Sequence, residues 1–234
     1  MIPLKDDNPT RRTPVLTYAL IATCVLAHLW QLSLGQEGAK WAIYTLGTIP
    51  AALFETGSLE FQRGLEQIGA LPPPATIVTS MFMHGGLMHL VGNMLYLWIF
   101  ADNIEDRLGR GRFILFYFIC GIIAVFAHAL PNMSSQVPMV GASGAISGVL
   151  GAYLLLYPKA HVLVLIPLGF FSQVVHLPAM LVLGFWFVLQ LLQSMAAGGG
   201  AGVAFGAHIG GFLAGMALLH LFLPSQSRSS RGLG

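Results

Sequence analysis

Charged residues are scarce in this sequence of 234 residues: Asp, Glu, Lys and Arg together make up 9%, against 56% hydrophobic residues. Soluble domains carry about 25% charged residues, so this composition excludes the water-soluble classes and indicates a membrane protein with several spans. The formal net charge is only +2, and no block of Lys or Arg with interleaved aromatic residues occurs. We therefore expect no nucleic-acid partner, because such proteins carry a basic patch or stripe.

Cysteine is nearly absent as well. The two cysteines, Cys24 and Cys120, both lie inside apolar segments, where a thiol behaves as a small buried hydrophobic group. This placement favours neither a disulfide nor a metal site. The polar segment 1–13 precedes a long apolar run without a convincing small-residue cleavage site. We therefore expect a retained membrane anchor there rather than a removed signal peptide.

Six apolar segments predict an all-α bundle of six transmembrane helices. About 20 residues at 1.5 Å per residue cross a hydrocarbon core of about 30 Å. The fourth segment is shorter because Pro158 ends it, and we expect a connector at 159–176 that Pro167 and Gly169 keep from spanning. The predicted spans are residues 14–34, 75–100, 113–130, 143–157, 177–195 and 203–223.

The Lys and Arg residues predict the orientation. Six spans place both termini on one side, and that side collects nine of the eleven Lys and Arg residues, which makes it cytoplasmic. The long loop 35–74 is then extracytoplasmic, with short pieces lying in the interface. We expect loop 196–202 to be mobile, the tail 224–234 to be disordered, and the membrane to be a bacterial inner membrane.

Polar side chains within the predicted spans need a reason, because they are costly in lipid. Ser143 begins the short fourth span, in a position that requires a hydrated cavity above it. His208 lies near the start of the sixth span, on the same side of the membrane. His89 and Asn93 are four residues apart and share one face of the second span. These four side chains can meet at one depth.

Small residues indicate which spans approach closely. They recur every four positions on the fourth and sixth spans, so neighbours of Ser143 and His208 can pack together. This would bring a hydroxyl nucleophile within reach of its general base. Because no Asp or Glu in the spans lies near enough to orient His208, we expect a Ser–His dyad. The rows are Gly144, Gly148 and Ala152, and Ala207, Gly211 and Gly215.

The free N–H groups at the start of the fourth helix, together with the helix dipole, would point at a developing oxyanion. His89 and Asn93 can donate to the same oxyanion from the facing helix. This combination predicts acyl-transfer chemistry that needs neither a cofactor nor a metal.

Three motifs resemble the rhomboid intramembrane serine proteases: Gly-Ala-Ser-Gly at 141–144, His-x-x-x-Asn at 89–93, and Ala-His-x-Gly-Gly at 207–211. Residues 80–93 also look like that family's second span, and the turn at 105–109 resembles the one that follows it. The match covers about residues 74–215.

The resemblance implies a six-helix bundle of the rhomboid type that cleaves transmembrane segments of other membrane proteins. Ser143 would be the nucleophile and His208 the base, with His89 and Asn93 as oxyanion partners. His84, Gly141, Gly144 and Gly211 would support the site. Substrate would enter between the second and fifth spans.

Two positions depart from that family. Many members carry an aromatic residue that stacks on the base four positions after the nucleophile, whereas this sequence has Ser147. Many also carry a Trp-Arg pair in the first external loop, and none occurs between residues 35 and 74.

Other interpretations remain open for single residues. Ser143 alone is more often a helix-packing residue, and His208 alone is more often a satisfied interior histidine. His84 and His89 are five residues apart, off one helical face and without a His-Glu-x-x-His pattern, so we expect no metal site. His84 more simply ties the loop to the helix.

Two other functions compete with proteolysis. One is a catalytically inactive rhomboid-like protein that binds transmembrane helices, and the other is a small transporter with a broken fourth helix. The presence of both Ser143 and His208 favours the protease.

Overall fold

The helices of this protein follow its apolar segments closely. The computed structural model describes residues 1–168, 171–196 and 204–224. Nearly all of the predicted mobile loop 196–202, and the predicted disordered tail apart from Pro224, lie outside the described residues.

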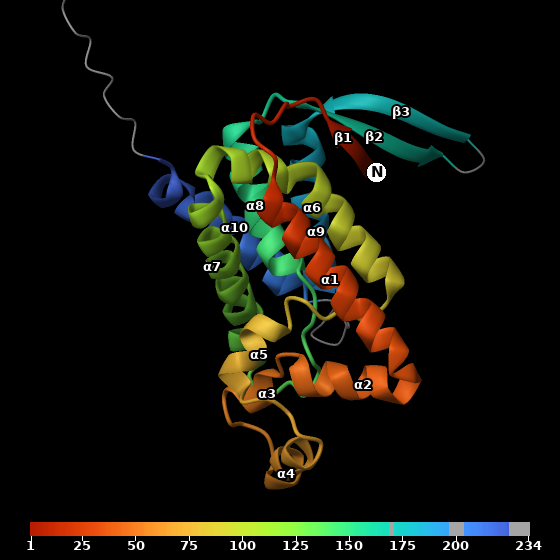
Figure 1. Cartoon of the computed structure of the whole chain (residues 1–234), viewed down its shortest axis with the longest axis vertical. Helices are drawn as coiled ribbons and strands as arrows, with labels where there is room; N and C mark the ends of the chain where they lie inside the picture. The colour runs from red at the N-terminus through yellow and green to blue at the C-terminus, as the bar shows by residue number, and fades with distance from the viewer. Residues whose placement is uncertain (169–170, 197–203, 225–234) are drawn as a thin grey trace, which may run out of the picture.

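Six helices within the described residues form an elongated bundle, with a small sheet at one end and short helices at the other (Figure 1). Three stretches among them are long and apolar enough to cross a membrane: Val15–Ser33, Arg110–Asn132 and Phe205–Phe222. Ser143–Leu156 and Ala179–Met195 are shorter apolar helices. The bundle helices are α1 (Val15–Ser33), α6 (Leu87–Leu108), α7 (Arg110–Ala129), α8 (Ser143–Leu156), α9 (Ala179–Ala196) and α10 (Phe205–Phe222).

The short helix α8 lies inside the bundle and packs against α6, α7, α9 and α10. Its closest neighbour is α10, as the spacing of small residues predicts. A Cβ atom added to Gly211 would lie 2.0 Å from the Gly144 carbonyl oxygen, and one added to Gly215 would lie 1.9 Å from that of Gly148. Only glycine therefore permits this separation of the two backbones.

The predicted second span is wrong as a single helix over 75–100. The chain forms α5 (Pro73–Thr79), turns through residues 80–86, and only then begins α6. Gly85 and Gly86 stand directly before α6, and Gly86 is extended, with φ 161°. Two adjacent glycines weaken a helix because they gain the most conformational freedom outside it. The turn places residues 80–86 beside the start of α8.

Helix α6 also runs beyond its predicted end, through the charged cluster to Leu108. The buried Glu105 carboxylate accepts hydrogen bonds from the backbone N–H groups of Leu16 (3.0 Å) and Thr17 (2.8 Å) and from the Thr17 hydroxyl (2.8 Å). The first N–H groups of a helix have no partner within it. Glu105 therefore caps α1 from a neighbouring helix.

The all-α expectation is wrong at one end of the bundle. The connector predicted at 159–176 contains instead the antiparallel strand β2 (His161–Leu168) and most of β3 (Phe171–Pro178), whose last two residues belong to the predicted fifth span. Strand β1 (Ile2–Asp6) completes a sheet of order β1-β2-β3. Val162 and Val164 are fully buried and alternate with more exposed neighbours. This two-residue period and these β-branched side chains are typical of a half-buried strand.

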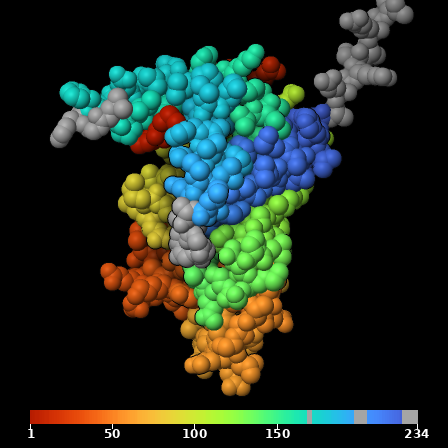
Figure 2. All heavy atoms as spheres, turned by 180° about the vertical axis from the view of Figure 1, so that it is seen from behind, coloured from red at the N-terminus to blue at the C-terminus, as the bar shows by residue number. Residues whose placement is uncertain are grey.

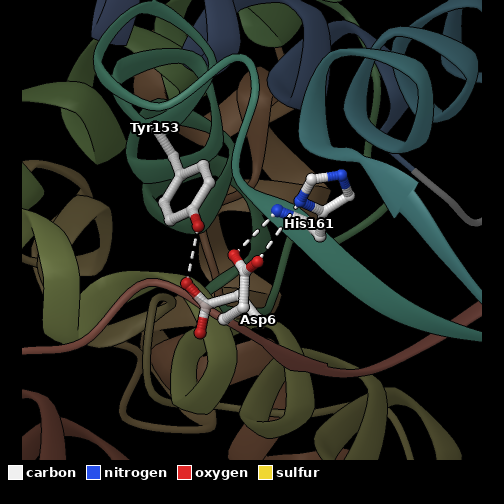
Figure 3. A network of polar contacts seen from close by, with 4 residues as sticks. Asp6, Tyr153 and His161 are labelled. Carbon is white, nitrogen blue, oxygen red and sulfur yellow. Dashed lines mark hydrogen bonds and ion pairs between the residues drawn. The ribbon is translucent and has the colours of Figure 1, made fainter.

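Polar contacts connect β1 to the rest of the protein (Figure 3). The Asp6 carboxylate accepts a hydrogen bond from the Tyr153 hydroxyl of α8 at 2.5 Å. The Asp7 carboxylate accepts one from the backbone N–H of His161 at 2.8 Å and lies 3.3 Å from the His161 ring. Burial raises the pKa of Asp6 above its ordinary value. The first residues of the chain are thus part of the fold.

The opposite end consists of the short helices α2 (Gly35–Leu46), α3 (Pro50–Leu53), α4 (Leu59–Gln67) and α5, and a 3-10 turn, η1 (Leu130–Asn132). Residues 35–74 are therefore largely helical, in the short pieces that the sequence predicts. Thr48 and Met139 exchange two backbone hydrogen bonds, of 3.1 and 2.7 Å. This bridge fixes the segment that leads into α8.

Candidate active site

Ser143 is the first residue of α8, and glycine geometry determines where that helix begins. Gly141 has φ +120°, a conformation that side chains disfavour, and its N–H donates to the Ser80 carbonyl at 2.9 Å. The first intrahelical bond runs from Ile146 N to the Ala142 carbonyl at 3.0 Å. The N–H groups before Ile146 therefore have no acceptor within the helix. Ser143 stands at the positive end of α8.

The structure brings Ser143 and His208 together. His208, near the start of α10, places its ring atom Nε2 2.7 Å from Ser143 Oγ. Both side chains are half-buried. The sequence predicts that these two residues can reach each other, and the glycine contacts between α8 and α10 are the reason they do.

The other ring nitrogen of His208 has a partner that the sequence analysis missed. His208 Nδ1 lies 2.6 Å from Oε1 of Gln190 on α9, and Gln190 is buried. A signal was available, because an amide in the middle of an apolar span needs a reason as much as a hydroxyl does.

An aromatic ring also packs on His208, again from α9. The rings of Trp186 and His208 have their centroids 6.0 Å apart at an interplanar angle of 35°. Ser147 contributes nothing comparable, because its hydroxyl donates to the Ser143 carbonyl at 2.6 Å. The ring support that the resemblance places on α8 is thus supplied here by α9.

His89 and Asn93 lie beside Gly141, which stands two residues before Ser143 in the sequence. A Cβ atom added to Gly141 would be 2.7 Å from His89 Nε2 and 3.4 Å from Asn93 Nδ2. His89 Nδ1 accepts from the Gly85 N–H at 3.4 Å, so Nε2 carries the proton of the neutral ring. Asn93 Nδ2 is buried without a hydrogen-bond partner among the described residues. Two N–H donors therefore lie next to the start of α8.

His84 holds the turn that carries these donors. Its backbone N–H donates to Gln31 Oε1 at 3.1 Å, and its carbonyl accepts from Gln31 Nε2 at 3.3 Å. Its ring meets that of His89 edge-on, with centroids 5.2 Å apart. His84 therefore connects α1, the turn 80–86 and α6.

A cavity of about 30 Å³ borders Ser143 and is also lined by Gly141, Ser80, Met139 and Ala207. One ordered water needs roughly 10–15 Å³ of such volume and two or more polar partners. The cavity therefore has room for one or two waters next to the hydroxyl.

Comparison with known proteins adds to this geometry. The model of the Rhomboid domain matches residues 74–225, well over half of the chain. Rhomboid protease GluP of Bacillus subtilis is 34% identical over 142 residues, 61% of this chain and 25% of that protein. Putative rhomboid protease YdcA of the same organism is 38% identical over 78 residues, 33% of this chain and 39% of that protein.

A similarity of the same order extends to an animal protein. Presenilin-associated rhomboid-like protein A, mitochondrial, of Danio rerio is 36% identical over 99 residues, 41% of this chain and 26% of that protein. The chain thus spans about a quarter to two-fifths of the length of these curated relatives. The family match includes α6, α8 and α10, the helices that carry the four polar side chains described above. On this evidence, the chain belongs to the rhomboid family.

Proposed function

We propose that this protein is an intramembrane serine endopeptidase that cleaves transmembrane segments of other membrane proteins with a Ser143–His208 dyad. The observation that carries the proposal is the 2.7 Å separation of Ser143 Oγ and His208 Nε2 at the N-terminus of a buried helix. A nucleophile and base in hydrogen-bond contact are the minimum for covalent catalysis.

In the proposed reaction, Ser143 Oγ attacks the carbonyl carbon of a substrate peptide bond while His208 Nε2 takes the hydroxyl proton. The imidazolium then returns that proton to the leaving amine, and an acyl-enzyme remains on Ser143. Water, deprotonated by the same ring, attacks the ester and releases the second product.

When Ser143 attacks, negative charge develops on the oxygen of the substrate carbonyl. Three kinds of hydrogen-bond donor lie near the position that this oxygen would occupy. They are the free N–H groups at the start of α8, the Nε2–H group of His89 and the Nδ2 amide of Asn93. Removing one such donor costs about 2.7–4 kcal/mol of transition-state stabilisation in an enzyme of this kind. Asn93 Nδ2 fits this role because no other described group satisfies it.

The proposal places α1, α6, α7, α8, α9 and α10 across the membrane, with the sheet on the cytoplasmic side. Lys5, Arg107 and Lys159 are among the cationic residues near the sheet end, whereas Lys40 and Arg63 belong to α2 and α4 at the other end. This asymmetry follows the positive-inside rule. The active site then opens to the extracytoplasmic side of the membrane, which we propose to be a bacterial plasma membrane.

Substrate would enter between α6 and α9. Seen from behind (Figure 2), α9 lies at the surface between α6 and α10. The rings of Tyr96 on α6 and Trp186 on α9 meet across this boundary, with centroids 6.3 Å apart. An entering helix must unwind near the site, because a helical carbonyl is already hydrogen-bonded. Helix-breaking residues in the substrate should therefore favour cleavage.

A fluorophosphonate probe tests the nucleophile directly. The wild type should be labelled and should cleave a tagged single-span substrate on co-expression. Ser143→Ala and His208→Ala should each lose at least about 10⁴-fold in cleavage rate, because the hydroxyl and its base act as a unit. Ser147→Ala should keep the label, since the Ser147 hydroxyl is bonded to the Ser143 carbonyl and not to His208.

The same measurement separates the competing functions. A helix-binding protein without activity, or a transporter, should show no difference in labelling between the wild type and Ser143→Ala. Equal labelling of the two proteins would end the protease proposal.

A further inference from the structure

We propose that Gln190 is the positioning residue of the dyad. Through Gln190, the orientation and tautomer of the His208 ring depend on the position of α9. This inference rests on the proposed protease function and deepens it. It adds a third member to a pair that, by sequence, has no carboxylate to orient its base.

The geometry defines which ring nitrogen of His208 carries the proton. Gln190 Oε1 is an acceptor only, so at 2.6 Å it accepts a hydrogen bond from His208 Nδ1–H. A neutral imidazole has one donor and one acceptor, so Nε2 is left as the acceptor. At 2.7 Å from Ser143 Oγ, Nε2 then accepts a hydrogen bond from the Ser143 hydroxyl. With the amide turned over, Nε2 would be protonated and unable to act as a base.

Burial makes this bond obligatory for Gln190. The side chain is 9% exposed and belongs to a helix that is otherwise almost entirely apolar. A buried amide without a partner loses the free energy of its hydrogen bonds to water. His208 Nδ1 is the hydrogen-bond partner recorded for its amide oxygen. The two groups therefore fix each other.

The bond also strengthens during the proposed reaction. When His208 accepts the Ser143 proton, the Nδ1–H group becomes part of an imidazolium, and hydrogen bonds to charged groups are about twice as strong as neutral ones. No proton moves to Gln190. The amide oxygen stabilises the cation and keeps Nε2 aimed at Ser143 Oγ.

Among the described residues, the contacts recorded for the His208 ring from outside α10, apart from that of Ser143, come from α9. Trp186 lies one turn before Gln190 on the same face, and its ring packs on His208. Helix α9 itself makes far sparser backbone contact with α10 than α8 does. The base is therefore supported by one of the two helices between which substrate would enter. A movement of α9 away from α10 would remove both supports from His208.

The test compares Gln190→Leu with Gln190→Glu in the full-length protein in membranes. Leucine removes the acceptor, and we expect kcat to fall about 10- to 100-fold with little change in KM, from the worth of a hydrogen bond to a charged group. Glutamate retains an oxygen at the same distance and should restore most of the rate. It should also move the acidic limb of the pH–kcat profile to higher pH, because a carboxylate stabilises the imidazolium.

Gln193→Leu is the matched control. Gln193 lies on the same helix but is exposed, so its loss should leave kcat unchanged. A Gln190→Leu enzyme with the rate of the wild type would overturn the proposal. So would equal losses in the leucine and glutamate variants, or an equal loss in Gln193→Leu, because either result would indicate packing rather than proton placement.

A second measurement does not depend on activity. In ¹⁵N-histidine spectra, the His208 signals, identified by their loss in His208→Ala, should show a protonated Nδ1 in the wild type and a shift toward protonated Nε2 in Gln190→Leu. An unchanged tautomer would overturn the role of Gln190 even if the protein is a protease. A wild type with the expected tautomer but no cleavage or labelling would instead overturn only the proposed function.

Discussion

At the scale of single residues, Gly141 controls more of the site than its size suggests. Its φ of +120° turns the chain into α8, and its missing side chain leaves room for His89 Nε2 and Asn93 Nδ2 beside Ser143. Any other residue at position 141 would have a strained backbone, and its side chain would collide with His89 Nε2 and contact Asn93 Nδ2. Backbone strain of this kind costs about 1–3 kcal/mol for residues other than glycine.

We therefore expect Gly141→Ala to lower kcat about 10²- to 10³-fold, the effect of displacing one oxyanion donor. The comparison is Gly92→Ala on α6, next to Asn93, where an added Cβ would meet nothing within 4 Å. Cleavage rate and fluorophosphonate labelling measure both variants. Wild-type activity in Gly141→Ala would show that His89 and Asn93 do not act from the positions described.

The sequence predicts that Ser143 and His208 can reach each other, because motif, helix register and small-residue spacing all bear on that pair. It does not predict Gln190 or Trp186 as the supports of His208. Their role depends on how α9 is rotated against α10, and an almost uniformly apolar helix carries little information about its own rotation.

At the scale of helices, the α8–α10 contact determines the separation of the dyad. The carbonyl oxygens of Gly144 and Gly148 on α8 occupy the space where side chains at Gly211 and Gly215 would stand. Adding one methyl group to this contact forces the two backbones apart. The distance from Ser143 Oγ to His208 Nε2 then increases as well.

Gly215→Ala should lower the free energy of unfolding by at least about 1–3 kcal/mol through overpacking. Gly184→Ala on α9 is the same substitution at a helical site with open space, and it should be neutral or stabilise by up to about 1 kcal/mol. Thermal unfolding in detergent compares the two. Equal stability of both variants would contradict the tight contact.

Helix positions are largely predictable here because lipid-spanning segments need long apolar runs. The break before α6 and the strands β2 and β3 are not predicted. The break depends on contacts of residues 80–86 with Gln31 and Gly141. Strand β2 lies between β3, its neighbour in the chain, and β1, about 160 positions earlier. A short apolar run alone does not distinguish a strand from an interfacial segment.

At the scale of the whole molecule, the sheet and the candidate active site are separated along helix α8. Helix α8 joins them, because it begins with Ser143 and carries Tyr153, which bonds Asp6, near its other end. Ten residues at 1.5 Å per residue place Tyr153 about 15 Å along the helix from Ser143. We therefore expect titration of Asp6 to affect the sheet rather than the chemistry of the dyad.

The raised pKa of Asp6, caused mainly by burial, has a definite consequence for stability. The folded protein holds this proton more tightly than the unfolded chain does. The free energy of opening the sheet therefore decreases as pH rises from about 4 through the raised pKa. Hydrogen exchange of the β1 amides, corrected for its intrinsic pH dependence, measures this decrease. In Asp6→Asn the decrease should disappear, and an unchanged slope in that variant would assign it to another group.

The pairing of β1 with β2 also determines how long β1 must remain unpaired during biosynthesis. Asp7 and His161 are 154 residues apart in the chain. At about 5–20 residues per second, a ribosome needs roughly 8–30 s to deliver the second partner after the first. Over that interval β1 has no partner strand, and the bundle helices α1, α6, α7 and α8 are synthesised before β2 can pair with it. A bulky protein domain fused before Met1 would already be folded when β2 is synthesised. It would then lie next to β1 while β2 pairs with it.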